Sequence, residues 1–404
     1  MTLLRSLLAR LRPAAAPEPQ TLRIAAMAAS DAERRAWRAL VDGFAAANPD
    51  IEAELLTVGE ASYKAEVAGW LERGEYDVMT GLGGAALRRF AAAGLVAPLG
   101  AAWRERGFDD LFTPAARHAV SVDGEPFGLP LNQTAWMLVY RRSVLARLGL
   151  PAPRQWEELL RAMAMLRASG LVPIALAGRE GWPAASWFDA IGLRRNGADF
   201  HGRLLAGEEP WDQPRVRGVL TELGRLRPFL DPAFREHGWH HVVAEIGSER
   251  AGFALLPSYV AAMFWDDVRG ELGCCPVPHF GTGAEPERPA AELAPTDLLM
   301  VAARGPGGTA AGRFLAHAAS APVQARFNAP QGKISANRLT PMPEDPLAAA
   351  GTALLHRAPA LVDFFDREIA PEAVGEAVEA LLAFLSGGAM EPALAALSRS
   401  TRPA

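Results

Sequence analysis

Strand-like and helix-like segments alternate along the first hundred residues. Residues 21–27 (TLRIAAM) and 51–58 (IEAELLTV) have the apolar and alternating patterns of strands. Between them Ser30 stands three residues before Glu33 in capping-box spacing, ahead of apolar residues at helical spacing over 37–44. A helix over 62–70, a strand over 76–80 and a helix over 85–93 follow. This order predicts a mostly parallel sheet with helices on both faces.

The rest of the chain repeats the alternation and then becomes mostly helical. Strands are expected over 172–176, 252–256, 274–277 and 298–303, and residues 281–295 form a loop rich in Gly, Pro and Glu. Helices are expected over 144–168, 183–195, 214–226, 258–265 and 310–319, and over most of 347–397. These elements predict a second α/β lobe with a helical tail.

Residues 122–177 mark the passage between the two lobes. An apolar run over 127–131 meets a polar Asn132-Gln133-Thr134 step, then Trp136 and a second apolar run over 137–140. A turn at Pro151 and Pro153 separates two helices. Small-molecule sites are preferentially found at domain junctions, so we expect a polar ligand between the lobes.

Composition narrows the class of partner. The chain has 404 residues, enough for two or three domains, and its net charge of −5 does not favour nucleic acid or an anionic membrane surface. The adjacent Cys274 and Cys275 cannot cross-link distant segments. Ten Trp against four Tyr favour stacking on the C–H faces of a ring-shaped ligand.

The N-terminus allows two interpretations. Residues 1–20 are Leu-rich, with a small-residue stretch at 14–16, but Arg5, Arg10 and Arg12 interrupt what would be the apolar core of a signal peptide. The segment is an amphipathic leader or linker, or the true start lies upstream. The fold is expected to begin near Thr21.

Two further sequence patterns could each mark a binding site or an ordinary structural element. Residues 81–86 fit G-x-G-x-x-A between a strand and a helix, as in a dinucleotide site, but a tight turn that donates N–H groups to ligand hydroxyls is favoured. His237, His240 and His241 with Glu245 resemble a metal cluster, although an exposed helix start is favoured. We predict no metal and no cofactor.

Carboxylates near the predicted crossings are the remaining candidates for chemistry. Asp297 precedes a strand, and Asp366-Arg367 lies in LVDFFDREIAPEA. Two carboxylates in a cleft can act as a glycosidase pair, or they can accept hydrogen bonds from sugar hydroxyls. Trp182, Trp187 and Asp189 surround the start of a helix, where one Trp is expected to face the cleft.

Several segments in order resemble the family-one extracellular solute-binding proteins of bacterial carbohydrate ABC transporters. These segments are GFAAANPDIEAELLTV, YDVMTGLGGAALRRFAAAGLVAPL, DGEPFGLPL with MLVYRRSVLARLGLPAPRQWEELL, GFALLPSYVAA and FLAHAASAPVQARFNAPQGKISANR. A closer subgroup shares WPAAxWFD within 182–197, APTD at 294–297 and FFDRE at 364–368.

The resemblance implies an α/β fold of the two-lobed periplasmic-binding-protein type (type II). Its sheets are mixed, with helices on both faces and the ligand in a cleft between the lobes. We place the first lobe at 21–129 and about 297–335, and the second lobe with its tail at 130–296 and about 336–404. A periplasmic monomer is implied that binds a sugar or polyhydroxylated solute and delivers it to ABC permease subunits, without catalysis.

The ligand-binding residues implied by the resemblance come from both lobes. They are Gly83, Gly84, Asn132, Trp136, Trp182, Trp187, Asp189, Tyr259, Asp297, Asp366 and Arg367. Related members often carry a Trp and a Glu-Arg pair in the turn where this chain has Gly81, Ala85 and Ala86. Two alternatives stay open, a hydrolase using Asp297 and Asp366 and a cytoplasmic sensor-type binding protein.

Overall fold

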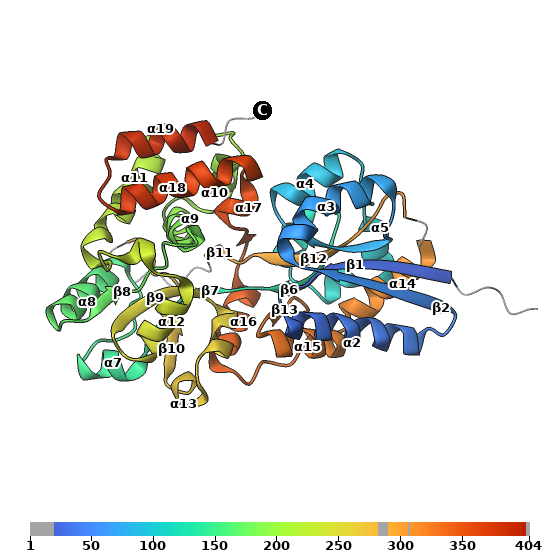
Figure 1. Ribbon diagram of the computed structural model, residues 1–404, viewed down its shortest axis with the longest axis horizontal. Coiled ribbons are helices and arrows are strands. Elements are labelled where there is room, and N and C mark those ends of the chain that lie inside the picture. The colour runs from blue at the N-terminus through green and yellow to red at the C-terminus, as the bar shows by residue number, and fades with distance from the viewer. Residues whose placement is uncertain (1–19, 282–289, 306–307, 401–404) are drawn as a thin grey trace, which may run out of the picture.

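The computed structural model describes residues 20–281, 290–305 and 308–400. The predicted leader and most of the predicted loop over 281–295 lie outside these residues. Two α/β lobes lie side by side, and segments that cross between them run through the centre of the molecule (Figure 1). The predicted mixed α/β, two-lobed fold is confirmed.

The first lobe is built on a six-stranded mixed sheet. Its strand order is β13 (Ile334–Ser335), β6 (Leu129–Gln133), β12 (Thr296–Val301), β3 (Val78–Leu82), β1 (Gln20–Met27) and β2 (Ile51–Val58). Strands β1, β2 and β3 are parallel, whereas β12 runs antiparallel to both β3 and β6. The helices of this lobe are α2 (Asp31–Ala47), α3 (Glu60–Arg73), α4 (Ala85–Ala92), α5 (Gly100–Arg106), α6 (Pro114–Ala119), α14 (Gly308–Ala319) and α15 (Ala321–Asn328), with 3-10 turns η2 (Phe108–Asp110) and η6 (Ala329–Gln331) and the hairpin strands β4 (Ser121–Val122) and β5 (Glu125–Pro126).

The second lobe is built on a four-stranded sheet. Its strand order is β10 (Leu272–Cys275), β7 (Trp136–Arg141), β9 (Ala251–Pro257) and β8 (Val172–Ile174). The helices around it are α7 (Arg142–Arg147), α8 (Trp156–Ala168), α9 (Trp182–Asn196), α10 (Ala198–Leu205), α11 (Pro214–Arg225), α12 (Trp239–Gly247), α13 (Asp266–Arg269), α18 (Val374–Leu385) and α19 (Met390–Ser400), with 3-10 turns η3 (Arg227–Phe229), η4 (Phe234–Glu236), η5 (Ser258–Met263) and η7 (Pro371–Ala373). Helices α16 (Pro346–Arg357) and α17 (Phe365–Glu368) and the paired strands β11 (Glu292–Leu293) and β14 (Leu361–Val362) lie near the junction of the lobes (Figure 1).

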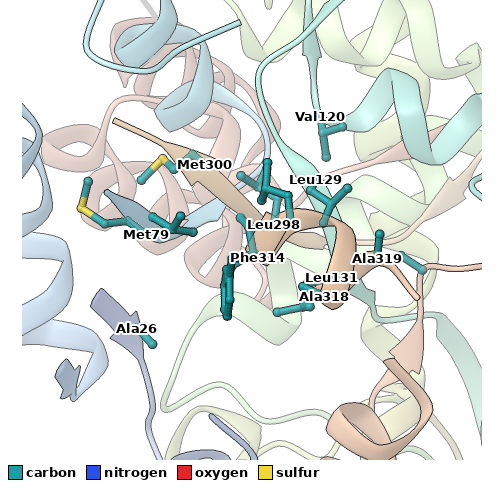
Figure 2. Close-up of a cluster of buried hydrophobic side chains, with 14 of the residues drawn as sticks. Ala26, Met79, Val120, Leu129, Leu131, Leu298, Met300, Phe314, Ala318 and Ala319 are labelled. Atoms are coloured by element: carbon teal, nitrogen blue, oxygen red, sulfur yellow. The ribbon is translucent and has the colours of Figure 1, made fainter. Parts of the chain in front are cut away.

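Each lobe has its own apolar core. Figure 2 shows Leu129, Leu298, Met300 and Phe314 meeting inside the first lobe, and all four are at most 1% exposed. Burial of a side chain of this size contributes about 1.5–3 kcal/mol. The second core gathers around Trp156, Trp187, Phe188 and Phe253. A third cluster, built mainly on β9 and α12, completes the second lobe, so each lobe packs largely within itself.

Most of the predicted elements form, with shifts that tertiary pairing explains. The Ser30–Glu33 capping box is confirmed, because the Glu33 N–H donates to Ser30 Oγ at 3.2 Å. The strand expected over 76–80 forms over Val78–Leu82 instead, because Gly81 and Leu82 pair with β12. The stretch 144–168 forms two helices separated by the segment with Pro151 and Pro153.

The first crossing of the chain lies between β6 and β7. Strand β6, which contains residues 130–133, pairs within the six-stranded sheet, and β7 begins the four-stranded sheet at Trp136. The predicted limits of the two lobes stay a prediction. None of the helices in the described ranges combines the length and apolar composition that a membrane crossing needs.

Candidate ligand-binding site between the lobes

Three neighbouring strands bring polar side chains to the edge of the first lobe. Asn132 on β6 pairs with Asp297 on β12 and with Ser335 on β13. Cross-strand partners project on the same face of a sheet, so these residues form one polar row. Because β6 continues directly into β7, the row stands where the chain enters the second lobe.

A chain of ion pairs runs across the junction from this row. Lys333 Nζ lies 3.2 Å from Glu33 Oε1 and 3.3 Å from Asp297 Oδ2. On the other side of Asp297, an Arg367 guanidinium nitrogen lies 3.5 Å from Asp297 Oδ1 and 3.5 Å from Asp363 Oδ1. The side chains of Lys333, Asp297 and Arg367 are only 19% to 22% exposed. Groups from α2, β12 and α17 are therefore linked across the two lobes.

Burial and charge compete in setting the protonation of this chain. Burial lowers the pKa of Lys333, but Asp297 and Glu33 raise it further, and the net pKa lies above the ordinary value. Arg367 shows the same balance, with Asp363, Asp297 and Asp366 raising its pKa. Burial raises the pKa of Asp363 to about 7, although Arg367 opposes the shift. Both cations thus stay charged near neutral pH, while Asp363 titrates there.

An aromatic wall stands beside the ion pairs on the side of the second lobe. The Trp136 ring packs edge-on against Phe364, with centroids 5.0 Å apart, and against Trp182 at 5.5 Å. The Arg367 guanidinium lies 5.7 Å from the Phe364 centroid. Adjacent aromatic faces and charged groups suit a molecule that has both C–H faces and hydroxyl groups.

Buried polar atoms without partners gather at the same crossing. Asn132 Oδ1, Gln133 Nε2, Trp136 Nε1 and Ser258 Oγ have no hydrogen-bond partner within the described part of the chain. An unsatisfied buried donor or acceptor costs about 1–3 kcal/mol. One amide oxygen, one hydroxyl and two N–H donors thus stand unpaired and almost without exposed surface at the crossing.

The turn between β3 and α4 meets the tail of the chain at very short range. A Cβ on Gly83 would lie 2.9 Å from Asp363 Oδ2, and one on Gly84 would lie 2.7 Å from Glu368 Oε1. Glu368 also forms an ion pair with Arg88 on α4, at 2.5 Å. Glycine is needed here because the carboxylates approach the backbone, and Gly84 has a positive φ of 73°. These carboxylates also disfavour a pyrophosphate at the G-x-G-x-x-A turn.

Tyr259 and Asp366 border the ion-pair chain. Burial raises the pKa of Tyr259, and the nearby charges that act on it belong to Lys333, Arg367, Asp297 and Glu60. Burial also raises the pKa of Asp366, opposed by Arg367 and by Lys64 of the first lobe. The structure therefore brings Gly83, Gly84, Asn132, Trp136, Trp182, Tyr259, Asp297, Asp366 and Arg367 to one junction.

Cavities on both flanks of the ion pairs are lined by both lobes. One of about 350 Å³ lies between η5 and the segment with Gly332 and Lys333. Another of about 500 Å³ lies between α4 and α10, where Asp363 and Glu368 also line it. Each is within the usual size range of small-molecule sites. The Lys333–Asp297–Arg367–Asp363 chain connects the walls of the two.

Two of the predicted ligand-binding residues lie inside the second lobe instead. Trp187 is 1% exposed and belongs to its core, and Asp189 is fully buried. Burial raises the pKa of Asp189, while its hydrogen bonds to His201 and the Phe365 N–H oppose the shift.

Sequence reasoning missed Glu33, Lys333, Asp363, Phe364 and Glu368. The scarcity of lysine was a usable signal for Lys333, because the chain has two lysines: Lys333 pairs with Asp297, and the charge of Lys64 acts on Asp366. Glu33 was interpreted only as a helix cap. In the structure its Oε2 accepts from the Ser30 N–H at 3.1 Å while Oε1 meets Lys333.

The histidine-rich segment lies elsewhere, at the start of α12. The His237 and His241 rings stack at 3.8 Å, and Glu245 pairs with Arg250 at 2.6 Å. Across the described ranges, no three His, Cys, Asp or Glu side chains come together to hold a metal ion.

The sequence is similar to known bacterial solute-binding proteins over part of its length. Residues 28–212 match the family model described as bacterial extracellular solute-binding protein. A probable sugar-binding periplasmic protein of Brucella suis is 24% identical over 182 residues, 44% of this chain and 42% of that protein. The mannitol-binding protein of Pseudomonas aeruginosa is 29% identical over 177 residues, 42% of this chain and 39% of that protein. The match thus spans less than half the length of each of these relatives.

Solved structures cover nearly the whole chain. The bacterial solute receptor AcbH, whose structures were described with an exclusive preference for β-D-galactopyranose, superposes with a TM-score of 0.86 at 22% identity, covering 95% of this chain and 97% of that one. A probable secreted solute-binding lipoprotein of Streptomyces coelicolor gives a TM-score of 0.82 at 20% identity, covering 96% and 100%. The predicted family resemblance is confirmed: residues 28–212 match the bacterial extracellular solute-binding proteins, and the chain has the two-lobed fold of solute-binding proteins.

Proposed function

We propose that the protein is the solute-binding component of a bacterial ABC importer. It binds a sugar or a related polyhydroxylated solute between its lobes and releases it unaltered to a membrane permease. We expect it to act outside the cytoplasmic membrane as a monomer. The relatives and structural neighbours named above are binding proteins, which supports binding rather than hydrolysis.

The observation that carries the proposal is the set of unsatisfied polar atoms beside an aromatic wall at the lobe junction. Asn132 Oδ1 and Trp136 Nε1 lack partners among the described residues, and Trp136 packs against Trp182 and Phe364. A hydroxyl-rich ring satisfies such atoms through its hydroxyls and covers the aromatic faces with its C–H groups.

The ion-pair chain gives the ligand contacts from both lobes at once. Asp297 and Lys333 belong to the first lobe, and Arg367 lies on α17 near the second. Charge-assisted hydrogen bonds to hydroxyls are roughly twice as strong as neutral ones. A solute that reaches both sides favours the closed arrangement, because the full set of contacts exists only there.

A thermal-shift screen against monosaccharides, disaccharides, oligosaccharides and polyols tests the proposal. A bound solute raises the melting temperature because it stabilises the folded protein, by about 2.7 kcal/mol when its free concentration is one hundred times its Kd. Calorimetry should then give one site per chain, and chromatography should recover the solute unchanged. Covalent products would instead support the hydrolase alternative with Asp297 and Asp366.

A pair of arginine variants supplies the control. Arg367→Met should weaken binding at least about tenfold, as expected when a charged hydrogen-bonding group is lost. Arg357→Met removes an exposed arginine outside the ion-pair chain and should leave affinity unchanged. Equal affinities in the two variants would remove Arg367 from the site.

A further inference from the structure

Asp189 is fully buried, yet it is tied to the helix that carries the ionic groups of the junction. It lies on α9, a helix whose residues from Pro183 to Leu193 are all buried inside the second lobe. Its Oδ2 accepts the backbone N–H of Phe365 at 3.0 Å, across 176 positions of sequence. Its Oδ1 lies 3.0 Å from His201 Nε2 on α10. Three elements distant in sequence therefore meet at one carboxylate.

The bond to Phe365 is made where a short helix needs a partner. Helix α17 is a single turn, and its N-cap residue Phe364 makes no side-chain capping bond. The first N–H groups of a helix have no partner within the helix, and a carboxylate is the preferred group beside them. Asp189 supplies this cap from another helix, so it fixes where α17 begins and how it is turned.

The rest of the surroundings hold the carboxylate in place. Gly192 leaves room for the imidazole, since a Cβ there would lie 2.7 Å from His201 Nδ1. The Phe365 ring packs edge-on against Phe188 and Trp211, with centroids 5.8 Å and 6.2 Å apart. His201 and Asp189 are 1% and 0% exposed, so neither bond competes with solvent.

We propose that Asp189 is a positioning residue, which caps α17 from within the second lobe and thereby places Asp366, Arg367 and Glu368 at the junction. The functional part of this inference rests on the proposed function: ligand affinity should depend on Asp189 although Asp189 does not touch the ligand. Its structural part concerns the unliganded protein. A misplaced α17 would carry Arg367 away from Asp297 and Glu368 away from Arg88.

Hydrogen exchange on the unliganded protein tests the structural part. The amides of Arg367 and Glu368 donate to the Phe364 carbonyl, each at 3.0 Å, and not to Asp189. Their exchange rates therefore report whether the turn persists when Asp189 changes. Asp189→Ala should speed their exchange at least about tenfold, the loss expected for one charge-assisted hydrogen bond. Asp189→Asn keeps an oxygen for the Phe365 N–H and should stay much closer to the wild-type rates.

Leu159→Ala is the control for general weakening of the second lobe. Leu159 is a fully buried residue of α8 in the same core. If it speeds exchange in α17 as much as Asp189→Ala does, or if Asp189→Ala has no effect there, the proposal is overturned. Unchanged exchange in Leu159→Ala with restored protection in Asp189→Asn supports it.

Binding of D-galactose and D-mannitol to the same variants separates this proposal from the proposed function. If the wild-type protein binds a probe, Asp189→Ala should weaken that binding at least about tenfold and Asp189→Asn should largely restore it. Normal binding by Asp189→Ala despite faster exchange would overturn the functional part. Failure of every carbohydrate to bind the wild-type protein would instead count against the proposed function, while the exchange data would still decide the role of Asp189.

Discussion

Trp136 and Asp363 are both buried at the junction, but the polar atoms of one lack a partner while those of the other face a charged group. Trp136 is 3% exposed and has an N–H without a partner in the described ranges, so it combines a packing role with an unused donor. Asp363 is almost as buried, but its carboxylate faces Arg367 and the Gly83 backbone. Trp136 should therefore affect the affinity for the ligand, and Asp363 should affect how stability depends on pH.

Trp136→Phe should weaken ligand binding while leaving the fold in place. The variant keeps an aromatic ring against Phe364 but removes Nε1, so about one hydrogen bond to the ligand is lost. The expected decrease in affinity is about fivefold to tenfold, measured by calorimetry with the solute found in the screen. An unchanged Kd would show that the indole N–H does not contact the ligand.

Asp363→Asn should flatten the dependence of stability on pH. The pKa of Asp363 is about 7 in the folded protein, above its ordinary value of 3.8. Its proton is therefore held more tightly in the folded state, and the associated stability is lost as pH rises through 7. Between pH 5 and pH 8 the wild-type protein should lose roughly 1 to 4 kcal/mol relative to the variant.

Thermal unfolding at the two pH values measures this difference. Asp42→Asn, an exposed carboxylate of α2, is the matched control and should follow the wild-type profile. Parallel profiles for wild type and Asp363→Asn would show that Asp363 is already ionised at pH 5.

At the scale of elements, the site depends on short segments whose ends meet. The turn before α4 brings its glycine backbone to the junction, η5 brings Tyr259, and the single turn α17 brings three charged side chains. The approach of α17 to the turn before α4 is possible because Gly84 has no side chain.

Gly84→Ala should therefore interfere with closure. Its methyl group would meet Glu368 Oε1 at 2.7 Å and separate Glu368 from Arg88. Gly94→Ala is the control, because Gly94 also has a positive φ but a Cβ there meets nothing within 4 Å. Both variants should lose stability through backbone strain, about 1–2 kcal/mol at Gly94 and about 1–3 kcal/mol at Gly84, whose φ of 73° with ψ of −143° is readily adopted by glycine alone. Only Gly84→Ala should also weaken ligand binding, by calorimetry; equal affinity losses would contradict the contact.

The sequence was sufficient for elements whose signals are local. The capping box of α2, the alternation over Ile51–Val58 and the proline-marked start of α11 all predicted structure that formed. Shifts arose where pairing extended a strand, as at Gly81 and Leu82. The depth of Trp187 and Asp189 was not predictable, because α9 is buried on every side and its sequence has no polar face that marks the cleft.

At the scale of the whole molecule, the buried apolar side chains form one cluster centred on the six-stranded sheet and two clusters around the four-stranded sheet. We expect rotation of one lobe against the other to leave most of this packing intact, with Met137 of β7 as a point where the first-lobe cluster reaches the second sheet. Hinge closure around a ligand uses this arrangement, with a few connecting residues absorbing the change. We expect closure to bring together the groups of two ion pairs, Asp297 with Arg367 and Arg88 with Glu368.

Small-angle scattering of the protein with and without its solute tests the central claim most directly. If the solute binds between the lobes and favours their closed arrangement, saturation should decrease the radius of gyration, and a carbohydrate that fails in the thermal-shift screen should leave it unchanged. The same titration with Arg367→Met should need a higher solute concentration for the same decrease. A radius of gyration that stays constant while calorimetry shows a saturated site would contradict binding by closure.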